Sequence, residues 1–285
     1  MRRTLLSVFI EEREGGIRAI IYMQQNTLLE SRETSFGYGG TLVLKDINFS
    51  IQAGDFVALM GPNGSGKTTL LKSILGIFTP IKGEILLDVK PILSYKAKDR
   101  AKKLGYVSQE PTFSFPLTVG ELVSLGRYAH SNRFKETPED GKVVEEALRL
   151  TGSLSLKDKR FTSLSGGERQ KVLIARVLAQ TSHLLLMDEP TSHLDIYFQL
   201  QILEALKRIC QEKKLTIVAV MHDLNLISLF ADKALVLKSG ELIAFGKVED
   251  VVNEKTLEET FGVNVLVRKE TEHETQYFFL RRPVS

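Results

Sequence analysis

The chain has 285 residues, of which 43% are hydrophobic and 26% charged, proportions typical of a globular protein with one large α/β domain or two small ones. Its formal net charge of +3 is too small to indicate nucleic-acid binding, and we expect no nucleic-acid partner. The single cysteine, Cys210, excludes an internal disulfide, and the longest apolar run, residues 215–221, is far short of the ~20 residues that span a membrane.

Residues 1–26 form a predicted N-terminal extension that is either disordered or upstream of a true start at Met23. Arg2, Arg3 and the apolar run at 5–10 resemble the beginning of a signal peptide. The run is too short, however, and charged residues follow it where a signal peptide has a small-residue cleavage site. We therefore expect the folded domain to begin near residue 27.

Residues 26–60 alternate short apolar segments with glycine-containing turns, which predicts antiparallel strands leading into a strand at 56–60. After a glycine-rich loop, apolar residues recur at helical spacing from Leu70 to Phe78, and Pro80 follows the end of this predicted helix. Strand, glycine-rich loop and helix is the context that a phosphate-binding loop requires.

The loop itself has the residue pattern of a nucleotide site. Its glycines allow backbone N–H groups to point at a phosphate, and the positive end of the next helix faces the same anion. Lys67 is expected to reach the β- and γ-phosphate oxygens of ATP, and the Thr68 hydroxyl to bind Mg²⁺. The predicted nucleotide-binding residues here are Gly61, Pro62, Asn63, Gly64, Ser65, Gly66, Lys67, Thr68 and Thr69.

A polar region follows the loop and its helix. Residues 96–103 are rich in lysine, which favours the solvated face of a helix over a nucleic-acid-binding patch. Residues 111–160 contain three prolines and show helical patterns at 119–127 and 143–150. We interpret this region as a mostly helical subdomain.

The next segments alternate strands with helices. Apolar strands at 184–187 and 215–221 follow predicted helices at 168–180 and 196–208, respectively, and unbroken apolar strands indicate a parallel sheet that is buried on both faces. The predicted fold class is α/β: a phosphate-loop NTPase core with a mixed or parallel sheet, an antiparallel β subdomain and the helical subdomain, all within residues 27–246. Residues 247–285 are a predicted extension of one helix and two strands.

Two acidic residues follow the apolar strand at 184–187. We expect this strand to lie beside the loop strand, so that Asp188 can hold Mg²⁺ through water. Glu189 is expected to point elsewhere and to polarise the attacking water as a general base. The alternative is that Glu189 only caps the segment before Pro190.

A third motif, Leu164-Ser165-Gly166-Gly167-Glu168, resembles the signature motif of the ATP-binding cassette ATPases of membrane transporters. With the phosphate-binding loop and the Asp188-Glu189 pair, this resemblance covers nearly the whole chain from residue 27. It implies that Ser165, Gly166 and Gly167 contact the γ-phosphate of ATP held by a second copy of the chain, in an ATP-sandwich dimer. Alternatively, Ser165 caps a helix, a role that is compatible with a contact to ATP.

The resemblance implies roles for four more residues. Gln109 resembles the glutamine that contacts Mg²⁺, and His222 the histidine that contacts the γ-phosphate and serves catalysis. Asp195 matches the loop that contacts the other subunit. Tyr38 occupies the place of the aromatic residue that stacks on adenine, with Phe36 as the alternative.

Residues 118–130, which end in Gly126-Arg127-Tyr128-Ala129-His130, resemble the importers of iron–siderophore complexes, haem and cobalamin, as do residues 221–226, 231–240 and 258–263. The implied function is ATP hydrolysis that energises metal-chelate import through a separate polytopic permease, and indirectly with an external substrate-binding protein. The implied location is peripheral, on the cytoplasmic face of the cell membrane. The alternative is a soluble cassette ATPase in a non-transport assembly acting on DNA, the ribosome or iron–sulfur biogenesis.

Overall fold

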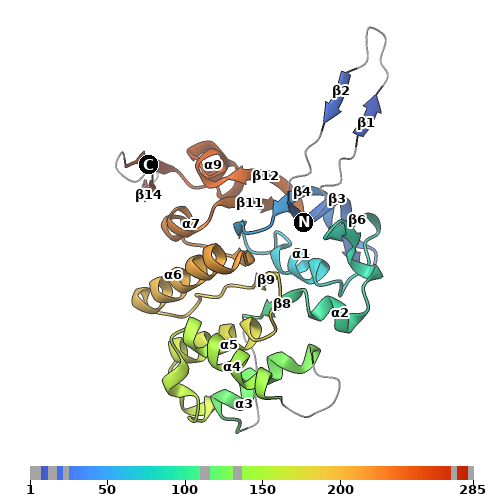
Figure 1. Ribbon diagram of the computed structural model, residues 1–285. Helices are drawn as coiled ribbons and strands as arrows, with labels where there is room; N and C mark the ends of the chain where they lie inside the picture. Colours follow the sequence, from blue (N-terminus) through green and yellow to red (C-terminus); the bar gives the residue numbers. More distant parts are fainter. Residues whose placement is uncertain are drawn as a thin grey trace.

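The computed structural model describes residues 8–11, 18–21, 26–109, 116–130, 137–270 and 275–281 (Figure 1). Within the predicted N-terminal extension it describes β1 (Val8–Glu11) and β2 (Arg18–Ile21), which pair antiparallel. The proposed start at Met23 lies outside the described residues. Among the described helices, none is both long and apolar enough to cross a lipid bilayer.

A six-stranded sheet in the order β12-β11-β5-β10-β9-β8 forms the centre of the chain. Every neighbouring pair is parallel except β11 and β12. The strands are β5 (Phe56–Met60), β8 (Leu104–Val107), β9 (Leu184–Met187), β10 (Thr216–Val220), β11 (Lys233–Lys238) and β12 (Glu241–Lys247). The side chains of β5, β9 and β10 are buried, which agrees with the apolar runs in the sequence.

One expectation about this sheet is wrong. The strand before Asp188, β9, is not adjacent to the loop strand β5, because β10 lies between them and pairs in parallel with both. Hydrophobic runs identify parallel strands but leave their order open, since chain connections can cross over a neighbour. The insertion of β10 brings the residues that follow it, including His222, between the loop and the acidic pair.

A second sheet has four antiparallel strands in the order β4-β3-β6-β7, as predicted for the antiparallel subdomain. Its strands are β3 (Thr27–Tyr38), β4 (Thr41–Gln52), β6 (Lys82–Leu87) and β7 (Lys90–Pro91). The helix α1 (Lys67–Ile74) follows the loop after β5, and its buried Leu70, Leu71 and Ile74 join a core shared with both sheets. This core holds the loop between the two sheets.

The α3, α4 and α5 helices gather at one end of the molecule (Figure 1). They have a core of their own, to which Val119, Leu148 and Val172 contribute, and their bounds are α3 (Val119–Ser124), α4 (Pro138–Leu150) and α5 (Gly166–Leu178). This agrees with the helical pattern of residues 111–160, of which 111–115 and 131–136 lie outside the described residues. Short 3₁₀ helices lie at Ile92–Ser94, Leu125–Ala129, Leu154–Leu156 and Phe161–Ser163.

A nearly buried ion pair joins two parts of this helical region. The Arg127 guanidinium donates from Nε to Asp140 Oδ1 at 2.8 Å and from Nη1 to the Ala179 carbonyl at 2.8 Å. Asp140 also caps α4 in a reciprocal capping box with Thr137. These contacts hold the pKa of Asp140 at about 2, with the Arg127 hydrogen bond as the largest cause. The Arg127-to-His130 segment therefore has a structural role, since His130 Nε2 also lies 2.8 Å from the Gln180 carbonyl.

The remaining helices are α2 (Ala97–Ala101), α6 (Ile196–Lys213), α7 (Leu224–Phe230), α8 (Val248–Val251) and α9 (Glu254–Phe261). Helix α2 has no buried residue, which agrees with a solvated helix at 96–103. The chain continues into a hairpin of β13 (Val265–Lys269) and β14 (Gln276–Leu280). This hairpin, which we call the C-terminal hairpin, packs on α7 through the central core.

Candidate nucleotide site

The loop between β5 and α1 needs glycine at two of its positions. Gly66, at the N-cap of α1, has φ 101°, and a β-carbon there would lie 2.6 Å from Leu44 Cδ2. A β-carbon on Gly61 would lie 2.2 Å from the Leu237 carbonyl oxygen. At Gly61 a side chain would clash with the backbone of β11, whereas at Gly66 the left-handed φ itself favours glycine. The tight backbone brings the loop N–H groups and the start of α1 together, an arrangement that suits an anion.

Two buried polar groups of the loop indicate what that anion is. Lys67 is only 7% exposed, and its ammonium group donates to the Gly61 carbonyl at 2.8 Å and the Pro62 carbonyl at 3.0 Å. Burial lowers the pKa of Lys67, opposed by Glu189 and Asp188. The Ser65 hydroxyl is buried without a hydrogen-bond partner in the described part of the chain. A desolvated cation beside an unsatisfied hydroxyl fits a bound phosphate.

Asp188 and Thr68 lie together beneath the loop. The Thr68 hydroxyl donates to Asp188 Oδ2 at 2.9 Å, and Asp188 is 5% exposed. On the neighbouring strand β8, burial first and then Asp188 raise the pKa of Tyr106 to about 12, so Tyr106 stays a neutral hydroxyl at physiological pH. One carboxylate and one hydroxyl are hard oxygen donors of the kind that Mg²⁺ prefers, so this pair fits the predicted metal.

Glu189 lies between two other predicted site residues. Its Oε2 accepts from Gln109 Nε2 at 2.8 Å, and its Oε1 lies 2.9 Å from His222 Nε2. The three residues follow β8, β9 and β10, which are adjacent parallel strands, so the sheet order produces the cluster. Glu189 has φ 50°, a left-handed backbone that is unusual outside glycine, and such strain gathers at functional sites. Both oxygens of the Glu189 side chain therefore contact other predicted site residues.

Tyr38 is the aromatic residue that is accessible next to the loop. The residue is 42% exposed, its hydroxyl donates to Thr69 Oγ1 at 3.2 Å, and its ring packs edge-on against Phe78 with ring centroids 4.8 Å apart. Phe36, the alternative, is 1% exposed and offers no free face. The structure therefore favours Tyr38 for stacking on a base.

The signature residues have structural roles within this chain. Ser165 caps α5 and forms a reciprocal capping box with Glu168. A β-carbon on Gly167 would lie 2.5 Å from the Phe198 ring, so packing alone explains that glycine. Gly166 differs, because its nearest neighbour would be Leu194 Cδ2 at 3.7 Å, an ordinary contact. Among the residues that the structure describes, no packing contact requires a glycine at 166.

Asp195 caps α6 by accepting from the Phe198 N–H at 3.0 Å. Across the described residues, no hydrogen bond or ion pair joins Ser165 or Asp195 to the phosphate-binding loop. The structure therefore brings together the loop, Thr68, Asp188, Gln109, Glu189 and His222 but leaves the signature residues out of this cluster. Asn63 and Gly64 lie on the exposed outer part of the loop.

Sequence reasoning missed one residue of this site. Tyr106 is absent from the predicted set, yet its hydroxyl interacts with Asp188. The signal lies in the register, because Tyr106 on β8 pairs with Leu186 on β9, two residues before Asp188. Such a pairing becomes visible only when the order of the strands is known.

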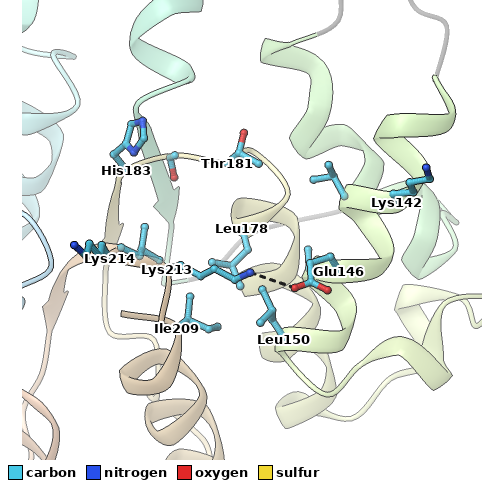
Figure 2. Close-up of a pocket in the computed structure, with 13 residues that line it drawn as sticks. Lys142, Glu146, Leu150, Leu178, Thr181, His183, Ile209, Lys213 and Lys214 are labelled. Carbon is cyan, nitrogen blue, oxygen red and sulfur yellow. Dashed lines mark hydrogen bonds and ion pairs between the residues drawn. The ribbon is translucent and has the colours of Figure 1, made fainter. Parts of the chain in front are cut away.

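A cavity lies away from this cluster, between α4 and the end of α6 (Figure 2). It encloses about 430 Å³, and its apolar floor includes Ala147, Leu178 and Ile209. Lys213 reaches across it toward Glu146, with 3.4 Å between the charged atoms. The cavity lies beside residues of α4, α5 and α6 and shares no lining residue with the loop.

Comparison with known proteins identifies the family. A profile of the ABC transporter family matches residues 44–192. The chain is 37% identical to the ferric enterobactin transport ATP-binding protein of Escherichia coli, over 84% of this chain and 89% of that protein. Two solved structures are also similar, and the match extends over almost the full length of each of those chains.

The first of these structures is an inward-facing ABC transporter assigned to the metal-chelate type, with 32% identity and a TM-score of 0.79 over 90% of this chain and 99% of that chain. The second is a dimeric, post-hydrolysis ATP-binding cassette bound to ADP and Pi, with 31% identity and a TM-score of 0.68 over 78% of this chain and 99% of that chain. Together with the loop and the Glu189 cluster, these likenesses show that the chain belongs to the ABC transporter family and is an ATP-hydrolysing cassette of it.

Proposed function

We propose that this cassette hydrolyses ATP to drive the import of a metal chelate through a separate membrane permease. The observation that carries the chemistry is Glu189, whose two carboxylate oxygens are held by Gln109 and His222. The transport assignment is supported by similarity, over more than four fifths of the chain, to a ferric enterobactin transport protein and to a metal-chelate type transporter. The same similarity disfavours a soluble assembly that acts on DNA, the ribosome or iron–sulfur biogenesis.

In this proposal the residues of the site divide phosphate binding, base stacking, metal binding and proton transfer among them. Lys67 and the loop N–H groups bind the β- and γ-phosphates, and Tyr38 stacks on the base. Thr68, Asp188 and Gln109 would hold Mg²⁺, which neutralises phosphate charge when it is bound. Glu189 accepts a proton from the attacking water. His222, whose Nε2 lies 2.9 Å from Glu189 Oε1, orients that carboxylate and contacts the γ-phosphate.

We further propose that two copies of the chain close around two ATP molecules. Ser165, Gly166 and Asp195 lie outside the loop cluster of their own chain, so their implied contacts need a partner copy. The unexplained glycine at 166 supports this, because a missing side chain lets another molecule approach the N-terminus of α5. The similar cassette that is dimeric with ADP and Pi supports it as well.

The partners of this dimer follow from the transport assignment. We propose a polytopic permease, a peripheral position on the cytoplasmic face of the membrane, and an external substrate-binding protein that contacts the permease. The transported compound belongs to the class of iron–siderophore complexes, haem and cobalamin. The permease and the binding protein select among these, since the cluster described above contacts only nucleotide.

Copurification from membranes tests the proposal. The tagged chain is extracted in mild detergent, and the copurifying proteins are identified and quantified. We expect a polytopic membrane protein at equal stoichiometry, whose binding protein is then screened with ferric siderophores, haem and cobalamin. Recovery of soluble partners or nucleic acid instead would overturn the transport assignment and leave the ATPase assignment in place.

A further inference from the structure

The C-terminal hairpin is fastened to the helix that follows the catalytic histidine. Two backbone N–H groups of β14 donate to side chains of α7: Phe278 to Asn225 Oδ1 at 2.9 Å, and Gln276 to Ser228 Oγ at 3.1 Å. Backbone donors that bond to side chains of a helix fix the strand in one register along it. The hairpin and α7 are therefore attached by directed bonds as well as by packing.

Apolar packing adds to these bonds. Phe278 is 7% exposed and Val265 1% exposed, and both belong to the core cluster that contains Leu226, Ile227 and Phe230 of α7. The alternate residues of β14, Tyr277 and Phe279, face outward and are 36% and 51% exposed. One face of the C-terminal hairpin therefore packs on α7, and the other faces outward.

The other end of α7 leads directly to the site. Asp223 caps the helix by accepting from the N–H groups of Asn225 and Leu226, and His222 precedes it. With seven residues the helix is roughly 10 Å long, so any tilt of its body moves its first turn. The His222 side chain is 46% exposed, so burial does not fix its orientation, and the placement of its backbone decides whether Nε2 reaches Glu189.

We propose that the C-terminal hairpin positions His222 for ATP hydrolysis, and that Asn225 is the positioning residue through which it acts. Asn225 is three residues from His222 and is tied to the hairpin by its side chain and to the Asp223 cap by its own N–H. Asn225 therefore contacts both the C-terminal hairpin and the Asp223 cap that follows His222. This inference rests on the proposed catalytic role of His222.

The test compares variants of the full-length chain in a steady-state ATPase assay, with ATP binding and melting temperature measured in parallel. Asn225→Ala removes the acceptor and is expected to lower kcat about fivefold, the factor for one ordinary hydrogen bond, with KM for ATP unchanged. Asn225→Asp keeps the acceptor oxygen and is expected to restore the rate. Tyr277→Ala alters the outward face of the same strand and serves as the matched control at the wild-type rate.

A double mutant shows whether Asn225 acts through His222. If it does, Asn225→Ala causes no further loss of kcat in a His222→Ala background. Additive losses, or a wild-type kcat in Asn225→Ala alone, would overturn the inference while the role of His222 stands. A wild-type kcat in His222→Ala would instead refute the proposed role of His222 itself. If Asn225→Ala fails to fold, Ser228→Ala removes the second bond and is subject to the same criteria.

Discussion

Removing the charge of Asp140 is expected to destabilise the helical region without touching the nucleotide cluster. The pair with Arg127 is nearly buried, since the two side chains are 14% and 12% exposed for Arg127 and Asp140. A fall in the pKa of Asp140 from 3.8 to about 2 corresponds to about 2 kcal/mol in favour of the charged form in the folded state. Because asparagine keeps the shape but loses the charge, Asp140→Asn should cost about 2 kcal/mol at pH 7.

The pH dependence of this cost has a definite sign. A carboxylate whose pKa is lowered on folding stabilises the protein fully above its unfolded value of 3.8, and this contribution disappears as the pH falls through about 2. The difference between wild type and Asp140→Asn should therefore be constant from pH 5 to pH 8. It should fall to about half near pH 3.

Urea unfolding followed by circular dichroism measures the difference, with Glu139→Gln as the matched control. Glu139 is exposed in the same first turn of α4, so its loss should cost less than about 0.5 kcal/mol. An Asp140→Asn variant as stable as the control at pH 7 would refute the reasoning. So would a difference that persists unchanged at pH 3.

Four further substitutions have specific expected outcomes. Glu189→Gln should bind ATP and dimerise on gel filtration but hydrolyse it at least about 100-fold more slowly, and brisk turnover would remove Glu189 as the base. Lys67→Ala should lose ATP affinity by about tenfold or more in a nucleotide titration, and unchanged affinity would contradict its phosphate contact. Gly166→Ala should melt within a few degrees of wild type, because its β-carbon has room, yet lose ATP-driven dimerisation; a normal dimer would count against the partner contact. Lys213→Met should change the unfolding free energy by less than about 1 kcal/mol, since its pair with Glu146 is exposed, and a larger loss would show that the cavity depends on this pair.

The sequence predicted the parts of this fold that depend on local pattern. The strands at 56–60 and 184–187 have the predicted bounds. The loop and its helix follow β5 as predicted, but α1 ends at Ile74 instead of continuing to Phe78, and Gly76 just after its end has a left-handed φ of 67°. The order of the strands could not be predicted, because β10 is set between β5 and β9 by pairing with segments more than 30 residues away in the chain. For the same reason the sequence did not predict the contacts of Glu189 with Gln109 and His222. The family resemblance implied roles for these residues but not their arrangement.

Structural roles were harder to predict than chemical ones. Arg127 appeared in the sequence as part of a family-like segment, whereas in the fold it anchors the start of α4 through Asp140. The hairpin at 265–280 was predicted as two strands, but nothing in its pattern indicated that its bonds go to α7. Side-chain partners that are distant in sequence depend on packing of whole elements, which periodicity does not encode.

The position of β10 has a consequence for synthesis of the protein. The loop strand β5 is made early, but both of its sheet neighbours, β10 and β11, lie beyond residue 215. A chain still being translated therefore exposes the edges of β5 until more than two thirds of its length has emerged, while the contacts among α3, α4 and α5 can already form. Nucleotide binding should accordingly appear late during translation, and ribosome-bound chains that stop before residue 215 should not retain ATP.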